Sequence, residues 1–199
     1  MKKWEDKLPP RARERLAEIK ITPEDRERIK GVERVKSLLS QFYQEKLTPE
    51  DLGEKLKDFG KESKEFLIKE AQTRLINSLG LQISSQDFKR RGKAILVLER
   101  LKSEGKHSSV KEEINLLGGL IKKCREEKDR VYEQLKKQVE SNPELRIRKV
   151  RTESGEVIVQ LSTEEAILSS PEWKEFISQQ ELACGSEFSK LVGKIKKML

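Results

Sequence analysis

Residues 110–138 read VKEEINLLGGLIKKCREEKDRVYEQLKKQ, and their apolar side chains recur at alternating steps of four and three residues. This heptad spacing keeps one stripe of a helix facing a neighbouring helix. Seven of the nine positions in the stripe are apolar or cysteine, which predicts a helix over residues 108–141, roughly 50 Å long at about 1.5 Å per residue. The stripe consists of Val110, Ile114, Leu117, Ile121, Cys124, Lys128, Val131, Leu135 and Gln138.

The heptad helix needs a partner, because its apolar stripe would otherwise face water. A helix over residues 85–104 is available, since the short segment 105–107 would connect the two as an antiparallel hairpin. The long helix outruns this partner, so we expect the N-terminal helices or a second subunit to cover its far end. Gly118 and Gly119 lie inside the long helix, where each glycine costs about 1 kcal/mol relative to alanine, and they predict a close helix crossing.

Two identical segments upstream predict helix starts. Residues 22–25 and residues 48–51 both read TPED. In each, the threonine can cap the helix, the proline suits its first position, and the two acids favour the positive end of the helix dipole. We therefore predict helices over residues 22–46 and 48–79, preceded by a short helix around residues 11–20.

An Asn-Pro pair at residues 142–143 ends the long helix, and a β-hairpin is predicted after it. Its strands would lie within residues 145–161. A two-residue turn at residues 154–155 would place Val150 opposite Val159. Because an isolated hairpin is marginal in water, we expect it to lie on the helical body or to pair with another strand.

These elements predict a mainly α protein: an elongated helical bundle with a long, coiled-coil-like helix hairpin and one small β-hairpin. The composition agrees, since 34% of the residues are hydrophobic and 39% are charged, against roughly 45–50% and about 25% in typical globular proteins. A thin bundle needs fewer apolar residues than a compact sphere. We expect one domain with an appendage, divided into a helical body over residues 1–141, the hairpin over 142–161, and C-terminal helices over 162–199 that pack on the body and begin at residues 162, 170 and 186.

The sequence predicts a cytoplasmic protein. No stretch approaches the roughly 20 apolar residues that cross a bilayer, and the N-terminus lacks the apolar core of a secretory signal. The basic terminal helix has a small apolar face, so binding to a membrane surface is not expected. Cys124 and Cys184 have no metal-type or CxxC spacing, and we interpret both as reduced, buried thiols.

Motifs for catalysis are missing from the sequence. The one histidine, His107, is predicted in a helix connection, where a lone histidine is usually a polar surface residue. HExxH, EF-hand and phosphate-loop patterns do not occur, nor does a nucleophile elbow. We therefore expect a protein that is not an enzyme, with no catalytic residues, no cofactor and no metal site.

Positive charge concentrates in residues 86–151, which carry 19 basic and 11 acidic side chains, whereas residues 152–185 carry 1 and 7. Two basic clusters lie in the first segment. They could pair with the acidic segment, which we favour, or bind nucleic-acid phosphates without reading sequence. The clusters are Lys89, Arg90, Arg91 and Lys93, and Arg146, Arg148 and Arg151.

Assembly is the function that we predict first. The chain would be a helical interaction protein, a homo-oligomer or a subunit of a larger complex, with the long helix as its organising element and the hairpin as a docking feature. The alternative is sequence-nonspecific, salt-sensitive nucleic-acid binding through the two basic clusters. The residues predicted to form the protein interface are Val110, Ile114, Leu117, Ile121 and Leu135.

Overall fold

The computed structural model describes residue 9 and residues 22–59, 61–103, 105–152 and 155–199, so the short helix predicted around residues 11–20 lies outside it. The side chains of residues 61–63, 150–152 and 155 also lie outside the described part. Within it the chain forms seven α-helices and one two-stranded antiparallel sheet, which confirms the predicted mainly α class. The elements are α2 (Pro23–Tyr43), α3 (Pro49–Lys57), α4 (Lys61–Asn77), α5 (Ser85–Glu99), α6 (His107–Ser141), the 3-10 helix η2 (Pro143–Arg146), β1 (Ile147–Thr152), β2 (Gly155–Gln160), α7 (Thr163–Ser169) and α8 (Pro171–Met198).

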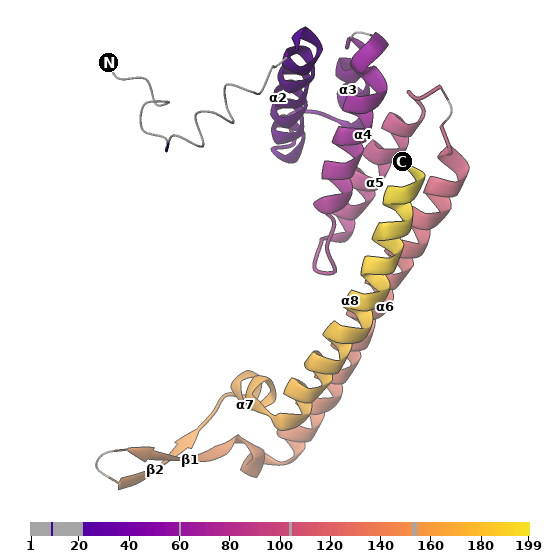
Figure 1. Ribbon diagram of the computed structural model, residues 1–199. Helices are drawn as coiled ribbons and strands as arrows, with labels where there is room; N and C mark the ends of the chain where they lie inside the picture. The colour runs from indigo at the N-terminus through magenta and orange to yellow at the C-terminus, as the bar shows by residue number, and fades with distance from the viewer. Residues whose placement is uncertain (1–8, 10–21, 60, 104, 153–154) are drawn as a thin grey trace.

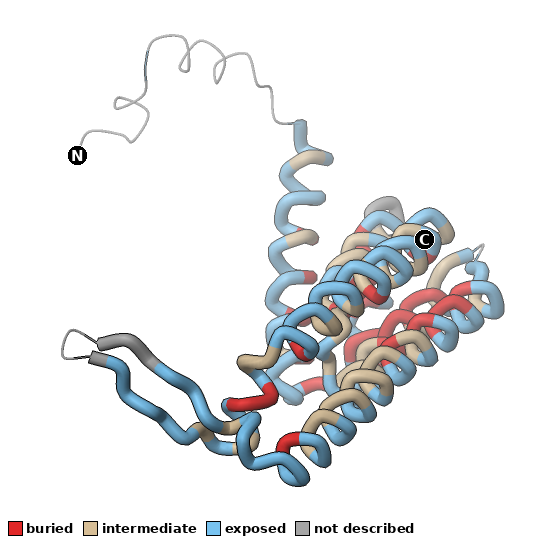
Figure 2. Tube along the Cα trace, turned by 90° about the horizontal axis from the view of Figure 1, so that it is seen from below, coloured by how far each residue is buried: buried red, intermediate tan, exposed pale blue. Residues whose placement is uncertain are grey.

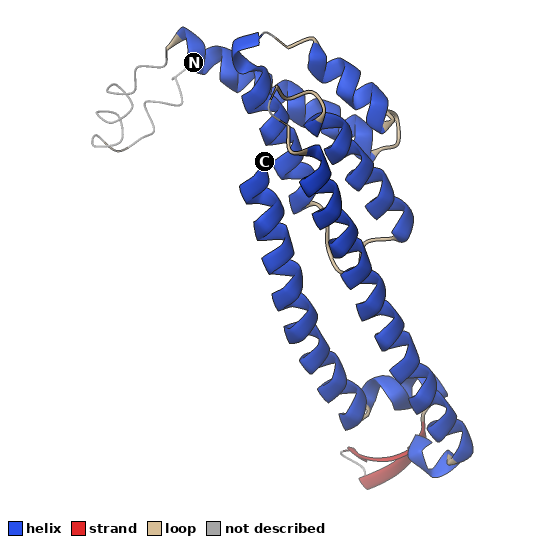
Figure 3. Cartoon of the chain, turned by 90° about the vertical axis from the view of Figure 1, so that its right-hand side faces the viewer, coloured by secondary structure: helices blue, strands red, loops and turns tan. Residues whose placement is uncertain are grey.

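These elements are arranged as a head, a stalk and a hairpin end (Figure 1). The head consists of α2, α3, α4 and α5. The stalk is the antiparallel pair α6 and α8, which lie side by side and carry the chain away from the head (Figure 3). The hairpin end comprises residues 142–170 and lies at the far end of the stalk. This extended shape accounts for the low apolar content, because a thin body exposes much of its surface.

Both TPED segments begin helices, as predicted. The backbone N–H of Asp25 donates to Thr22 Oγ1 at 3.1 Å, and the Asp25 carboxylate accepts from the backbone N–H of Thr22 at 3.1 Å. Thr48 and Asp51 make the same pair at 3.1 and 2.9 Å. These reciprocal bonds satisfy donors that a helix start leaves unpaired. The bonds from the capping threonines also lower the pKa of both aspartates.

Two predicted helix boundaries are wrong. The helix predicted over residues 48–79 is broken, because α3 ends at its C-cap Asp58; Gly60, the expected weak point, lies outside the described residues. The break lets α3 and α4 both face one core, which a single straight helix could not do. The separate helix predicted over residues 186–199 is the end of a continuous α8. Packing along α6 outweighs the low helix propensity of Gly185, about 1 kcal/mol relative to alanine.

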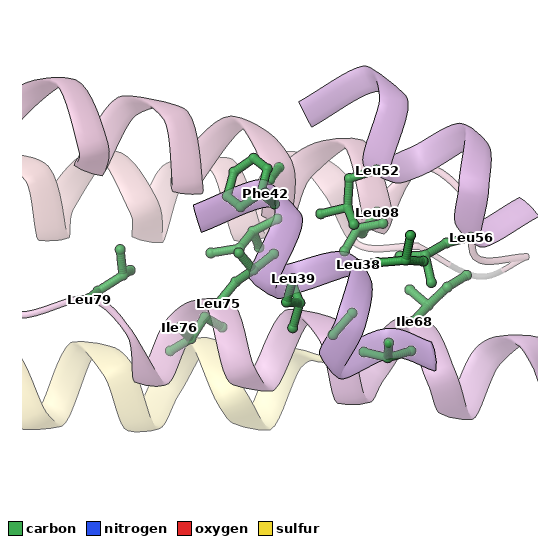
Figure 4. Close-up of a cluster of buried hydrophobic side chains, with 14 of the residues drawn as sticks. Leu38, Leu39, Phe42, Leu52, Leu56, Ile68, Leu75, Ile76, Leu79 and Leu98 are labelled. Atoms are coloured by element: carbon green, nitrogen blue, oxygen red, sulfur yellow. The ribbon is translucent and has the colours of Figure 1, made fainter. Parts of the chain in front are cut away.

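Two hydrophobic cores hold the molecule together. The larger one joins the head to the first half of α6 and the end of α8, and includes Phe42, Leu52 and Leu98 (Figure 4). Its buried residues gather in the helical body (Figure 2). The smaller core lies where the stalk meets the hairpin end and is formed by Val139, Ala166, Ile167 and Trp173 with their neighbours.

The predicted glycine crossing lies at one of the two glycines in α6. A Cβ at Gly118 would be 2.7 Å from Phe88 Cε1 of α5, whereas nothing lies within 4 Å of the corresponding position at Gly119. The hydrogen at Gly118 therefore leaves room for the Phe88 ring.

α8 is the main partner of α6, and the sequence did not predict it. α5, the predicted partner, covers the heptad stripe only near the head. The far end of the stripe is covered by α7 and α8 of the same chain. The expectation that the N-terminal helices or a second subunit would cover this end is therefore wrong, because the chain returns through the hairpin end and supplies the partner itself.

A disulfide between Cys124 and Cys184 joins the two stalk helices between the cores. It links residues 60 apart in sequence, and beside it Gln180 Nε2 donates to the carbonyl of Cys124 at 2.8 Å. The prediction of two free thiols is wrong. The cytoplasmic expectation loses the support that it drew from them, because disulfides are rare in a reducing compartment.

The predicted β-hairpin is confirmed, but its register is not. The ladder places Val150 opposite Val157, whereas the predicted turn at residues 154–155 placed it opposite Val159. The last described pair of the ladder is Thr152 with Gly155, so the glycine assigned to the turn belongs to the ladder. A shift of two residues keeps every side chain on its predicted face, because side chains alternate along a strand.

Candidate functional site

The described residues do not bring together a set of side chains that could bind a metal ion. No three or more His, Cys, Asp or Glu side chains among them could hold a metal ion. His107 begins α6, where its Nε2 accepts a hydrogen bond from Arg100 Nε at 3.1 Å. An open groove of about 610 Å³ lies between α2 and α4, but its cationic side chains, Lys36 and Arg74, already form ion pairs within their own helices.

None of the described helices combines the length and the apolar character that a membrane crossing requires.

The most buried carboxylate in the described part of the chain stabilises the connection between α5 and α6. Glu99 is 1% exposed. Its Oε2 accepts from Gln72 Nε2 and Lys102 Nζ, both at 2.8 Å, and its Oε1 accepts from the backbone N–H of Lys106 at 2.8 Å. Burial opposes ionisation, but the hydrogen bonds from Lys102, Gln72 and Lys106 outweigh it and lower the pKa of Glu99. With both oxygens engaged by its own chain, Glu99 serves the fold.

Arg90, in the first predicted basic cluster, is turned toward the end of α2. Its Nη2 donates to the backbone carbonyl of Phe42 and, at 3.2 Å, to that of Leu47. The guanidinium also lies over the Phe42 ring, 4.3 Å from the ring centroid. Arg90 therefore links α5 to the segment between α2 and α3, and only 18% of its side chain is exposed.

Two further residues of this cluster also bond to the head. Arg91 Nη1 donates to the carbonyl of Ser78 at 2.5 Å, and Lys93 forms an ion pair with Glu50 at 2.8 Å. Lys89 is exposed. Three of the four cations in the cluster, Arg90, Arg91 and Lys93, therefore bind groups of the same chain.

We expect Arg90→Ala to lower the free energy of unfolding by about 2–3 kcal/mol, because it leaves two carbonyls without their charged donor and removes the contact with Phe42. Lys89→Ala, one position earlier on the same helix, should change it by less than about 0.5 kcal/mol. Urea unfolding followed by circular dichroism measures both. Equal effects of the two substitutions would show that Arg90 has no special structural role.

The second basic cluster contacts backbone carbonyls near the hairpin. Arg146 Nε donates to the carbonyl of Leu161 at 2.9 Å, and Arg148 Nη2 donates to that of Ser169 at 3.0 Å. Both acceptors belong to the acidic segment, but none of the described ion pairs joins this cluster to a carboxylate of that segment. The side chain of Arg151 lies outside the described part.

The five residues predicted to form a protein interface lie inside the chain. Four of them are buried in the larger core, and the fifth is half-buried against the smaller one. Their neighbours belong to the head and to α7 and α8, so an interface between copies through this stripe would require those elements to leave it. The four are Val110, Ile114, Leu117 and Ile121, and the fifth is Leu135.

Exposed apolar side chains concentrate at the hairpin end. Of the eleven large ones that are exposed in the described part of the chain, six lie in residues 142–170. Ile158, at the middle of β2, exposes 68% of its surface. A cluster of this kind on one end of a molecule is typical of an interaction site. Its members are Leu145, Ile147, Val157, Ile158, Val159 and Leu168.

The hairpin projects from the stalk (Figures 1 and 3). Ile147 and Ile158 lie on one of its faces and Val157 and Val159 on the other, and all four are exposed. Neither face is therefore buried against a described helix, and the expectation that the hairpin lies on the helical body is wrong. Since a sheet generally needs three or more strands to be stable by itself, pairing with another strand stays a prediction.

The two strands of the hairpin differ in chemistry. β1 reads IRKVRT, with three cations, and β2 reads GEVIVQ, with a single acid and a central run of three apolar residues. Within the described part of the chain the sheet has two strands, so each strand has one edge that no described strand covers. One free edge is cationic and the other is apolar.

A groove beside the hairpin has mixed charge. About 470 Å³ in volume, it is lined by Arg148, Glu165, Lys174 and the apolar Leu161 and Leu168. Because both signs of charge line it, the groove favours no simple anion or cation, and we regard it as part of the same docking region.

Comparison with known protein families gives a match over most of the chain. A family model described as "Family of unknown function (DUF6657)" matches residues 53–199, which include the stalk and the hairpin end. No curated protein and no solved structure matches the chain significantly.

Proposed function

Because the chain belongs to DUF6657, a family of unknown function, we propose from its own geometry that it is a non-enzymatic assembly protein that binds a protein partner through its hairpin end. The observation that carries this proposal is the concentration of exposed apolar side chains on a projecting hairpin. Burying them in an interface would gain roughly 25 cal/mol per Å² of apolar surface.

The stalk supports the proposal because it fixes the position of the hairpin end. Tyr132 and Trp173 pack edge to face at 5.6 Å between ring centroids, in the smaller core. The disulfide between Cys124 and Cys184 then joins the stalk helices closer to the head. These contacts fix the base of the hairpin end, which reduces the conformational freedom lost on binding and so favours affinity.

Nucleic-acid binding is the weaker candidate. It would need free cations, and Arg90, Arg91 and Lys93 already have partners within the chain. The aromatic side chains that stack on unpaired bases do not occur in either strand of the hairpin. We therefore place it second to protein binding.

Site-specific photocrosslinking tests the proposed docking end. A photoreactive phenylalanine analogue placed at Ile158 or Leu168 of the full chain, in the cells that make it, should give protein adducts of discrete mass. Leu116 and Leu182 are the matched controls, because they are also large, apolar and exposed but lie on the stalk. The partner is then identified, purified and titrated, and Ile158→Asp should weaken its binding by at least about tenfold.

Adducts formed equally at all four positions, or at the stalk positions alone, would contradict docking through the hairpin end. The mass of the adduct also separates a second copy of this chain from a different protein.

A further inference from the structure

The free edge of β2 offers a definite set of backbone groups. The backbone N–H of Leu161 donates to the carbonyl of Arg146 at 2.8 Å, which identifies these two as a hydrogen-bonded pair of the ladder. Hydrogen-bonded and non-hydrogen-bonded pairs alternate along antiparallel strands. The N–H and C=O groups of Glu156, Ile158 and Gln160 therefore point away from β1 and remain available to another strand.

The chemistry of β2 suits pairing with itself. When two copies of one strand pair antiparallel around a twofold axis, the residue on the axis lies opposite itself. With Ile158 on the axis, Val157 lies opposite Val159 of the second copy, and Glu156 lies opposite Gln160 of the second copy. No like charges face each other, and all three outward-pointing residues of each copy form hydrogen-bonded pairs.

β1 does not suit such pairing. Its outward-pointing residues include Lys149, which the ladder places opposite Ile158. Self-pairing around Lys149 would place two lysines directly opposite each other, and like charges in this position destabilise a sheet. The cationic edge thus disfavours the same arrangement that the apolar edge allows.

We propose that two copies of the chain pair through β2, antiparallel and centred on Ile158, into one four-stranded sheet. This inference rests on the proposed docking role of the hairpin end. It identifies the protein that binds there as a second copy of the chain. The pairing brings Val157 and Val159 of both copies together on one face and the two Ile158 side chains together on the other. It also supplies the strands that an isolated hairpin lacks.

Disulfide trapping tests this register. The two cysteines of the chain are bonded to each other, so a cysteine introduced by Ile158→Cys is the one free thiol. In the proposed sheet the two copies of position 158 are about 5.5 Å apart between Cα atoms, within the roughly 4.4–6.8 Å that a disulfide spans. Mild oxidation of the full chain should therefore give a covalent dimer, detected on a non-reducing gel.

Glu156→Cys is the matched control, on the same face of the same strand. Its two copies would be separated by about 13 Å along the strands and should not form a disulfide. Equal trapping at positions 156 and 158 would overturn the register, and trapping at 156 alone would overturn the centre on Ile158.

Light scattering across a dilution series tests the pairing without a new thiol. The wild-type chain should be a dimer that dissociates on dilution. Ile158→Pro removes an outward-pointing N–H and should give a monomer, without breaking the ladder with β1; Ile158→Thr keeps that N–H and should dimerise more strongly than the proline variant. A wild-type monomer at every concentration, or a larger polymer from pairing of unlike edges, would overturn the inference. A monomer whose hairpin still crosslinks to a different protein would leave the proposed function intact.

Discussion

Reduction of the disulfide between Cys124 and Cys184 should lower the free energy of unfolding by about 4 kcal/mol, as the chain-entropy model gives for a closed loop of this length. The disulfide links residues 60 apart in sequence, and the closed loop contains the whole hairpin end. For a chain of this size the loss corresponds to a fall of about 10 °C in the melting temperature. Urea and thermal unfolding with and without reductant measure it.

The loss of stability on reduction should be largest at the far end of the stalk. The smaller core lies inside the closed loop, and outside it α6 and α8 remain joined through the larger core by residues such as Ile121 and Ile195. Hydrogen exchange should therefore quicken in residues 125–183 before it does in the head. A variant with both cysteines replaced by alanine should be as stable as the reduced wild type, and reductant should not change its stability. Unchanged unfolding of the wild type on reduction would show that the stalk packing alone holds the far end.

The local elements were predictable because their signals are local. The TPED segments carry a cap, a proline and two acids within four residues, and the heptad stripe repeats often enough to define a long helix. The side of each helix that faces the core is harder to predict. Ile29 and Phe66 have the spacing of inward-facing residues in their helices, yet both are exposed, because a spacing that fits a helix does not say where the neighbouring helix ends.

Pairings between distant elements were not predictable in the same way. The partner of α6 is separated from it by the hairpin end, and its helix contains Gly185, a residue with low helix propensity. Cys124 and Cys184 have no spacing that relates them, and only the antiparallel stalk brings their Cα atoms to 6.5 Å.

The candidate site was predicted in part. The hairpin itself followed from the strand pattern, whereas its role in docking is still a proposal. The solvent exposure of the hairpin could not be predicted from the sequence, because whether Val157 and Ile158 face a helix or water depends on how the stalk ends. Arg90 looked like a phosphate ligand for a similar reason: its acceptors, the carbonyls of Phe42 and Leu47, are visible only in three dimensions.

Glu99→Gln should lower the free energy of unfolding by about 3–5 kcal/mol, the typical cost of removing one partner from a buried ion pair. Both carboxylate oxygens accept hydrogen bonds, whereas an amide has a single acceptor oxygen. Its NH₂ group would therefore face another donor, and Lys102, 11% exposed, would lose its counter-charge. Glu112→Gln, on an exposed position of α6, is the control and should change stability by less than about 0.5 kcal/mol.

The pH dependence of the same pair of proteins separates the charge of Glu99 from its shape. The pKa of Glu99 is lowered in the folded chain, so its contribution is complete above the unfolded value of about 4.3 and is lost as the pH falls through the folded pKa. The stability gap between wild type and Glu99→Gln should therefore be constant near neutral pH and narrow below about pH 4. Urea unfolding at a series of pH values measures the gap. A gap that stays constant down to the acid unfolding of both proteins would mean that the amide costs stability through its geometry alone, and that the ionised carboxylate does not stabilise the connection between α5 and α6.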